Sequence, residues 1–203
     1  MYKITKRIID LFVAAIALML LSPGLIPSIL ILLRTGEHEV FYFQKRIGYK
    51  NKLFDIWKFA TMMKNSPNIG TGEITLRNDP RVTKFGKILR MTKVNELPQI
   101  INVFKGDMSI VGPRPDIAGY YDLLEGEDRK ILELKPGLTS LASLKYYNED
   151  ALLDNQDFPL EYNDKILFPD KLRMNLEYYH HQSFHVDLKI ILATFKLICN
   201  RSK

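Results

Sequence analysis

The residues from Leu11 to Leu33 contain no charged side chain, and an apolar run of this length can cross a lipid bilayer. Ser22-Pro23-Gly24 interrupts the run near its middle, and Pro27 follows. Because proline lacks an amide hydrogen and its ring clashes with the preceding turn, a helix that reaches Ser22 is expected to kink or end there. The Ser22 hydroxyl could replace one lost backbone hydrogen bond. Two arrangements follow: one spanning helix, or a helical hairpin that enters and leaves through one membrane face.

Basic residues flank the apolar run on both sides, with Lys3, Lys6 and Arg7 before it and Arg34 after it. Positive charge at both ends suits a segment whose two ends meet one anionic, cytoplasmic membrane face, which favours the hairpin. A secretory signal would have a shorter apolar core and a small-residue cleavage site, so the segment is interpreted as a retained anchor. We therefore divide the chain into a re-entrant membrane anchor, residues 1–36, and a cytoplasmic domain, residues 37–203.

The composition limits the partners of the chain. Its 203 residues suit one domain with a modest core. Cys199 is the only cysteine, so no internal disulfide can form and a reducing compartment is expected. The net charge of +6 calls for an anionic partner. The basic residues are scattered among acidic ones, and no nucleic-acid-binding motif occurs, so membrane lipids and not nucleic acid are the expected partner.

Local patterns after the anchor predict short strands and several helices. Strands are expected over residues 39–44 and 53–59 with a turn at 46–51 between them, a loop over 65–78, and helices over 79–91, 98–106 and 187–198. The last helix is amphipathic and basic, so it could lie on a membrane or pack on the core of the domain. The predicted fold class is α/β: a helix-rich small domain with short strands, on a re-entrant helix hairpin and surface amphipathic helices.

Two short motifs suggest phosphate chemistry. Glu96 precedes the helix expected from Pro98, where free amides favour an anionic ligand, and its carboxylate could bind a divalent metal. The alternative is a simple charge at a helix end. Arg114 lies between Pro113 and Pro115, so its guanidinium is held in place for bidentate phosphate binding, unless the segment is only a rigid turn.

Many ordered motifs together resemble one known family, the small monotopic phosphoglycosyl transferases of bacterial surface-glycan assembly. The matching segments are Lys6-Arg7-Ile8-Ile9-Asp10, Ser22-Pro23, Gln44, Arg46, Gly48, Phe54, Lys58-Phe59, Asp79-Pro80-Arg81-Val82-Thr83, Gly86, Leu89-Arg90, Glu96-Leu97-Pro98-Gln99, Asn102 to Ser109, Val111 to Pro115 and Lys135 to Thr139. The resemblance implies an enzyme on the cytoplasmic face of the inner membrane, anchored by a re-entrant helix. It also implies transfer of sugar 1-phosphate from a UDP-sugar to polyprenyl phosphate, with Mg²⁺ as cofactor.

The family mechanism uses an Asp-Glu pair, in which the Asp attacks the phosphate nearest the sugar and releases UMP. The resemblance places this catalytic pair at Asn95 and Glu96, with Glu96 also the metal ligand. The candidates for binding substrate phosphate are Arg114, Arg90, Arg81 and Lys58. The candidates for binding the lipid phosphate or the membrane are Lys6, Arg7, Ser22 and Pro23. A homodimer is left open.

Asn95 departs from the family pattern, because a neutral amide is a very poor nucleophile and cannot neutralise a metal ion. Four explanations compete: an engineered replacement, a natural variant in which Glu96 does more of the work, a glycosyltransferase that moves only the sugar to a lipid-linked acceptor, or an inactive adaptor. The region from Lys145 to Lys171 resembles a subgroup insertion that would read the sugar.

Overall fold

The computed structural model describes residues 2–64, 66 and 79–200. Its helices are α1 (Tyr2–Arg34), α2 (Lys84–Met91), α3 (Gln99–Lys105), α4 (Leu141–Lys145), α5 (Glu149–Asp154), α6 (Pro159–Tyr162), α7 (Phe168–His181) and α8 (Phe184–Asn200). Its strands are β1 (Phe41–Ile47), β2 (Leu53–Phe59), β3 (Ser109–Val111) and β4 (Gly137–Thr139). Short helical turns are η1 (Tyr49–Asn51), η3 (Val94–Glu96), η4 (Tyr121–Leu123), η5 (Asp128–Glu133) and the π-helical η6 (Asn163–Leu167). The predicted helix-rich α/β class is confirmed, whereas the loop expected over 65–78 lies outside the described residues except for Ser66.

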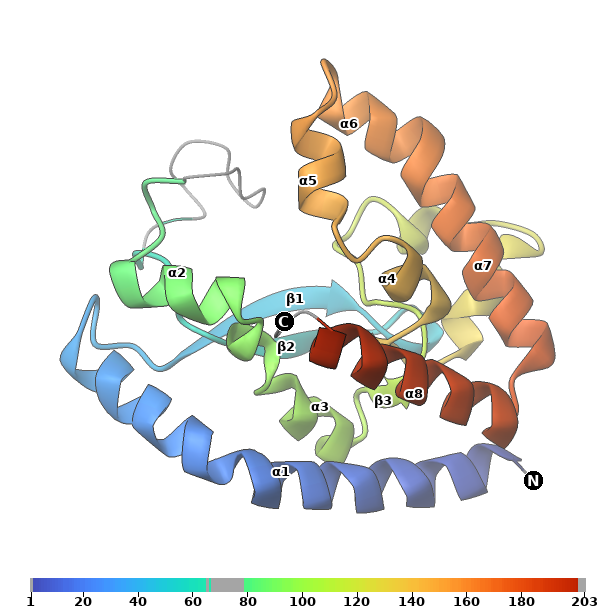
Figure 1. Ribbon diagram of the computed structural model, residues 1–203. Helices are drawn as coiled ribbons and strands as arrows, with labels where there is room; N and C mark the ends of the chain where they lie inside the picture. The colour runs from blue at the N-terminus through green and yellow to red at the C-terminus, as the bar shows by residue number, and fades with distance from the viewer. Residues whose placement is uncertain (1, 65, 67–78, 201–203) are drawn as a thin grey trace.

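The apolar run forms a single helix, α1, whose axis bends near its middle (Figure 1). The helix does not end at Ser22-Pro23, and the other expectation, a kink within the run, agrees with this bend. Pro23 has no amide hydrogen to donate to the Met19 carbonyl one turn earlier, and the Ser22 hydroxyl donates to that carbonyl instead, at 2.8 Å. The helix consequently continues through the proline while bending. In the described part of the chain, α1 is the one helix long and apolar enough to cross a membrane.

One side of α1 packs on the domain along both halves of the helix. In the first half, Ala14 is buried in a cluster with Ile100 and Val103. In the second half, Leu32 is buried against Phe59 and Leu89. The other side of the helix exposes large apolar side chains: Ile4, Ile8, Phe12, Met19, Leu20, Ile26, Leu30, Ile31 and Leu33. Both ends of the apolar helix therefore contact the same folded body.

The antiparallel hairpin β1–β2 pairs Phe41 with Phe59 and Ile47 with Leu53. The prediction for β2 is confirmed, but β1 begins later than expected and continues through Arg46, which the sequence placed in the turn. The reversal is made at η1, where Lys50 has a positive φ of 54°. One end of the hairpin packs near α2 and the other near α7 (Figure 1), through the apolar clusters that contain Phe59 and Ile47 respectively.

A parallel pair, β3–β4, was not predicted from the sequence. Ser109 pairs with Gly137, and Val111 with Thr139. The two segments approach so closely that a Cβ on Gly137 would lie 2.1 Å from the Gly112 nitrogen, which no side chain can satisfy. This contact brings the segment after β3 against the loop before β4.

The helices that frame the site begin at different signals. The prediction that Asp79 caps a helix is wrong: α2 begins at Lys84, where the Thr83 hydroxyl accepts from the Gly86 amide at 3.0 Å, because the Asp79 carboxylate binds Arg81 instead. The prediction for α3 is confirmed, since it follows Pro98 and ends at Gly106.

One of the two interpretations of the C-terminal amphipathic helix, packing on the core of the domain, is confirmed for one face of α8. Ile190 is buried in a cluster with Tyr178 and Val111. Leu192 and Phe195 on the other face remain 59% and 67% exposed. Figure 1 shows α8 beside the first half of α1, and the Lys6 ammonium on α1 binds the Asp187 carboxylate on α8. That the exposed apolar face of α8 lies on a membrane surface stays a prediction.

Candidate active site

Glu96 and Arg114 form the centre of the candidate site. The two guanidinium nitrogens Nη1 and Nη2 of Arg114 donate to Oε2 and Oε1 of Glu96 at 3.2 and 2.9 Å. Glu96 lies in η3, immediately before α3, and Arg114 follows β3. A bidentate guanidinium–carboxylate pair of this kind has a defined geometry. The two motifs that the sequence singled out therefore meet in space.

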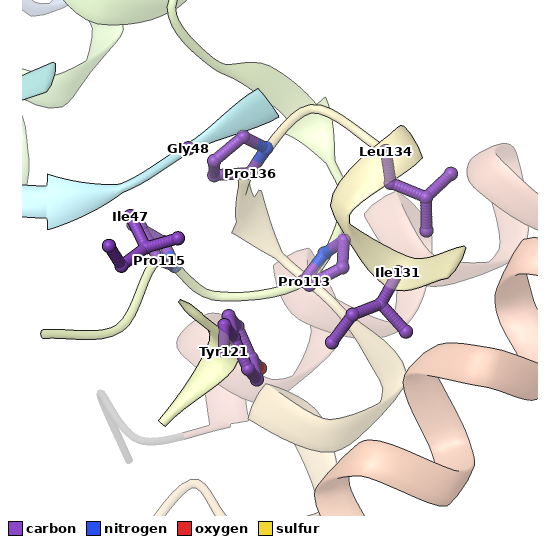
Figure 2. A pocket seen from close by; sticks show the side chains of 8 residues that line it. All are labelled: Ile47, Gly48, Pro113, Pro115, Tyr121, Ile131, Leu134 and Pro136. Carbon is purple, nitrogen blue, oxygen red and sulfur yellow. The ribbon is translucent and has the colours of Figure 1, made fainter. Parts of the chain in front are cut away.

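The backbone around Arg114 is fixed by its neighbours, as predicted. Pro113 and Pro115 line a small apolar cleft, which Figure 2 shows with Tyr121, Ile131 and Pro136 around them. The Pro113 carbonyl also accepts from the Gly137 amide at 2.8 Å. The prolines are thereby anchored in the body of the domain, and the Arg114 side chain, 52% exposed, extends to Glu96.

A row of polar side chains crosses the face of the β1–β2 hairpin. The buried Gln44 accepts with its Oε1 atom from the Lys58 ammonium at 3.1 Å and from Arg46 Nη2 at 2.8 Å. Residues 44, 46 and 58 share one face because side chains alternate along a strand and Tyr42 is paired with Lys58. This row joins the end of the hairpin near α2 to the end near α7.

Charges around Glu96 shift its acidity. Burial raises the pKa of Glu96, but the charge and hydrogen bonds of Arg114, together with Lys58 and Lys93, outweigh burial and lower the pKa to about 2. Glu96 is therefore ionised at any physiological pH while Arg114 is paired with it. As a result, it cannot donate a proton in this state.

The pKa of Lys58 is far below that of an ordinary surface lysine. Burial is the largest cause, and nearby Arg46, Arg114 and Arg90 add to it, so that the pKa of Lys58 falls to about 7 despite the charge of Glu96. We use "basic cluster" for Lys58, Arg90, Lys93 and Arg114 around Glu96. Even without Lys58, which is only partly protonated near pH 7, the three other basic side chains outnumber the single carboxylate at the centre, which suits an anionic ligand.

Asn95 lies beside Glu96 in η3 and is only 8% exposed. Its side-chain oxygen Oδ1 is buried and has no hydrogen-bond partner among the described residues. A buried polar atom without a partner usually costs about 1–3 kcal/mol, and water, an ion or a ligand can supply the missing contact. The Asn95 side chain can therefore accept a hydrogen bond from a ligand, but its neutral amide cannot act as a nucleophile.

The other two arginine candidates occupy different surroundings. Arg90 Nε donates to the Thr61 hydroxyl at 2.9 Å, and its charge acts on Lys58, which makes it a member of the basic cluster. Arg81 is 2% exposed, is bound by both oxygens of Asp79, and donates to the Ser66 carbonyl at 2.7 Å. Arg81 therefore stabilises the loop before α2 and is not presented to a ligand.

The candidates for binding lipid phosphate are engaged in contacts within the protein. The Asp187 carboxylate accepts from Lys6 and from the hydroxyls of Tyr2 and Tyr178. Arg7 donates to the carbonyls of Val103 and Phe104 at 2.6 and 2.9 Å, at the C-terminal end of α3, where a cation is favourable. These contacts fasten the start of α1 to α3 and α8, while Ser22 and Pro23 lie at the bend of α1.

The residues of the basic cluster do not form a ready site for Mg²⁺. Across residues 2–64, 66 and 79–200, no group of three or more His, Cys, Asp or Glu side chains is placed to bind a metal ion. Both carboxylate oxygens of Glu96 accept from Arg114, and neighbouring cations would repel a divalent ion. We therefore derive no step through a metal, and the expectation of Mg²⁺ stays a prediction.

Gln44 and Arg46 were not singled out as site residues from the sequence. The signal was present, because a two-residue period places them on one face of a strand, opposite a strand that contributes Lys58. Each residue alone looks like an ordinary exposed polar residue of a strand. Only the pairing of β1 with β2 brings them next to the basic cluster.

Fold and site together define a protein with one helix suited to a membrane and a basic site suited to phosphate. A family model described as bacterial sugar transferase matches residues 1–201. The chain is 34% identical to the UDP-glucose:undecaprenyl-phosphate glucose-1-phosphate transferase of Escherichia coli (strain K12) over 98% of this chain and 41% of that protein. The identity to the protein of the same name from Klebsiella pneumoniae is 35%, over 97% of this chain and 41% of that one. The chain belongs to the bacterial sugar transferase family.

Relatives differ in length. The chain spans 42% of an uncharacterized sugar transferase of Haemophilus influenzae, at 30% identity over 98% of this chain. It spans less than half of the Escherichia coli and Klebsiella proteins as well. The shared part is therefore a unit that also occurs inside longer proteins.

Proposed function

We propose that the chain transfers sugar 1-phosphate from a UDP-sugar to a polyprenyl phosphate, in the synthesis of a surface polysaccharide or glycoconjugate. The names of the Escherichia coli and Klebsiella relatives describe this reaction for glucose 1-phosphate and undecaprenyl phosphate. The observation that carries the proposal is the Glu96–Arg114 pair inside the basic cluster. A diphosphate would neutralise the excess of positive charge that surrounds this pair.

The side chains have distinct tasks in this proposal. The planar fork of Arg114 is suited to two phosphate oxygens, so a bound diphosphate competes with Glu96 for it. Lys58 becomes more readily protonated when phosphate approaches, and with Arg90 it stabilises the charge that spreads over the transferred phosphoryl group. Glu96, once separated from Arg114, regains a higher pKa and can accept a proton.

The membrane arrangement is part of the same proposal. Both halves of α1 pack on one body, through Ala14 and Leu32, which supports a re-entrant helix whose two flanks stay on one side of the bilayer. The basic residues at both ends favour the cytoplasmic face of the inner membrane. The exposed apolar sides of α1 and α8 would lie against lipid and place the basic cluster near a polyprenyl phosphate headgroup.

The presence of asparagine at position 95 allows two alternatives to the proposed function, which an experiment must distinguish. Because its amide cannot form a phosphosugar intermediate, the chain could instead transfer the sugar alone, or bind the donor without turnover. The buried Oδ1 atom of Asn95, which has no partner among the described residues, supports a polar contact with the donor in all three cases. The nucleotide released by the protein distinguishes the three reactions.

The decisive experiment incubates the purified chain in lipid nanodiscs with polyprenyl phosphate, Mg²⁺ and a panel of UDP-sugars. Release of UMP with formation of a polyprenyl diphosphate sugar is the expected result. Release of UDP would show transfer of the sugar alone, and release of neither nucleotide would overturn the proposed activity. An Arg114→Met variant is the matched control, because it removes the guanidinium and leaves the fixed backbone of the two prolines.

A further inference from the structure

A second group of charged side chains lies at the end of the β1–β2 hairpin that packs near α7. Arg46 Nη1 is 3.8 Å from Asp116 Oδ1. Lys171 Nζ, on α7, is 2.5 Å from Glu149 Oε1, on α5. We call these four residues the wall cluster. They come from β1, from the segment after Arg114, and from two helices of the region that the sequence marked as a subgroup insertion.

The two ion pairs of the wall cluster share one neighbourhood. The charges of Arg46, Lys171 and Glu149 all act on Asp116, and both carboxylates act on the buried Tyr121. Burial is the main cause of the raised pKa of Asp116, with Glu149 adding to it. The charges of both ion pairs therefore act on the same residues, Asp116 and Tyr121, at the end of β1 where the Ile47 amide donates to the Asp116 carbonyl at 2.8 Å.

The four side chains are accessible to a ligand but are not fully solvated. Their exposed fractions are 18% for Arg46, 32% for Asp116, 31% for Glu149 and 21% for Lys171. Exposed surface ion pairs are mobile and contribute little, whereas partly buried pairs hold their carboxylates in defined positions. Fixed, partly exposed carboxylates are suited to accepting hydrogen bonds from neutral hydroxyl groups.

The wall cluster continues the row that begins in the basic cluster. Gln44 accepts from both Lys58 and Arg46, at 3.1 and 2.8 Å. A ligand whose phosphate binds Lys58 and which extends along the hairpin would meet Arg46 and Asp116. A UDP-sugar carries its sugar ring on one side of the diphosphate and uridine on the other, and we assign the wall cluster to the sugar side.

We infer that Asp116 and Glu149, positioned by Arg46 and Lys171, accept hydrogen bonds from hydroxyl groups of the donor's sugar and select among UDP-sugars. This inference rests on the proposed function. A site built to bind a hydroxyl group rejects an analogue that lacks it far better than an apolar site does. Specificity therefore resides in the segment of residues 145–171 together with Asp116, apart from the groups that bind phosphate.

The test measures binding, so that it does not depend on turnover at Asn95. Isothermal titration gives the Kd of UDP and of each UDP-sugar for the wild-type chain, for Glu149→Gln and for Asp116→Asn. We expect each variant to lose about tenfold or more in affinity for the preferred UDP-sugar, with the Kd of UDP unchanged. Glu161→Gln is the matched control, since Glu161 pairs with Lys165 at 2.6 Å outside the wall cluster.

The ratio of the two Kd values is the readout, because partial loss of fold weakens both ligands together. Equal weakening of UDP and UDP-sugar, or no change in either variant, would overturn the inference while leaving the proposed function intact. A wild-type chain that binds no UDP-sugar would overturn both. The two variants disturb different ion pairs, so if one of them fails to fold, the ratio measured for the other still tests the inference.

Discussion

Glu96 and Arg114 lie 18 residues apart and are joined by two hydrogen bonds, between both guanidinium nitrogens and both carboxylate oxygens. Both terminal nitrogens of Arg114 are thereby engaged by Glu96. Under the proposed function, a phosphate that takes both of these nitrogens displaces Glu96 and leaves its carboxylate beside the phosphate. The proposal therefore couples donor binding to the release of Glu96.

Replacing Arg114 by lysine keeps the charge and removes the fork. We expect Arg114→Lys to weaken UDP binding about tenfold or more, since hydrogen bonds to charged groups contribute about 1.5–3 kcal/mol each. Isothermal titration with UDP measures the effect. Arg129→Lys, at an arginine outside the basic cluster, is the control, and equal affinities for all three proteins would contradict the role of the fork.

Replacing Asn95 by aspartate restores a carboxylate at a buried position beside Glu96. Loss of a covalent nucleophile commonly costs several orders of magnitude in rate, so Asn95→Asp should raise UMP release about a hundredfold or more. The intact mass of the variant should also show a phosphosugar adduct when lipid acceptor is omitted. Asn95→Ala serves as control; a variant with aspartate that gains nothing would argue for divergent chemistry.

The lowered pKa of Lys58 links stability to pH. In the unfolded chain, Lys58 stays protonated up to its ordinary pKa of 10.5, whereas in the folded chain it loses its proton near pH 7. Between these values the unfolded state binds more protons, so stability rises with pH. We expect the unfolding temperature of the wild-type chain, relative to Lys58→Met, to increase from pH 7 to pH 10. A constant difference would contradict the shift.

The two flanks of α1 should lie on one side of the membrane. In a Cys199→Ser background, Lys3→Cys and Glu37→Cys should both react with a membrane-impermeant maleimide in inside-out vesicles, and neither should react in right-side-out vesicles. Met19→Cys, at the exposed apolar side of the helix, should stay protected in both. Labelling of the two flanks from opposite sides would establish a spanning helix instead.

The buried Asp187 carboxylate should matter more to stability than an exposed one. Removing one partner of a buried ion pair costs about 3–5 kcal/mol, so Asp187→Ala, which leaves Lys6 and two tyrosines unpaired, should lower the free energy of unfolding by about that amount. Asp55→Ala breaks the exposed pair with Lys45 and should cost less than about 1 kcal/mol. Chemical denaturation in detergent micelles compares the two; similar effects would show that the cluster is dispensable.

Features that depend on neighbours in the chain were predictable. Residues 53–59 alternate as a strand requires, Pro98 and Gly106 bound a helix through their backbone preferences, and two prolines fix Arg114. The length and composition of the apolar run from Leu11 to Leu33 are enough to predict a candidate membrane segment. Each of these signals depends on residues close together in the sequence, so it can be interpreted without knowledge of the fold.

Features that depend on distant partners were decided by the tertiary structure. The sequence suggested Arg81 and Lys6 as ligands for phosphate. In the structure, Arg81 is buried in an ion pair with Asp79, and Lys6 forms an ion pair with Asp187, far along the chain. A single sequence does not reveal whether an arginine will bind a phosphate or pair with a carboxylate of the same protein. The same holds for the wall cluster, whose residues come together only when β1, α5 and α7 pack.

The sequence by itself determined the local elements, the candidate membrane helix and the chemical character of Glu96 and Arg114, because backbone preferences and apolar periodicity act between near neighbours. Only the tertiary structure decided which charges meet. Electrostatic pairing depends on distance and burial, and both are set by the packing of α1, the hairpin and the C-terminal helices around one core.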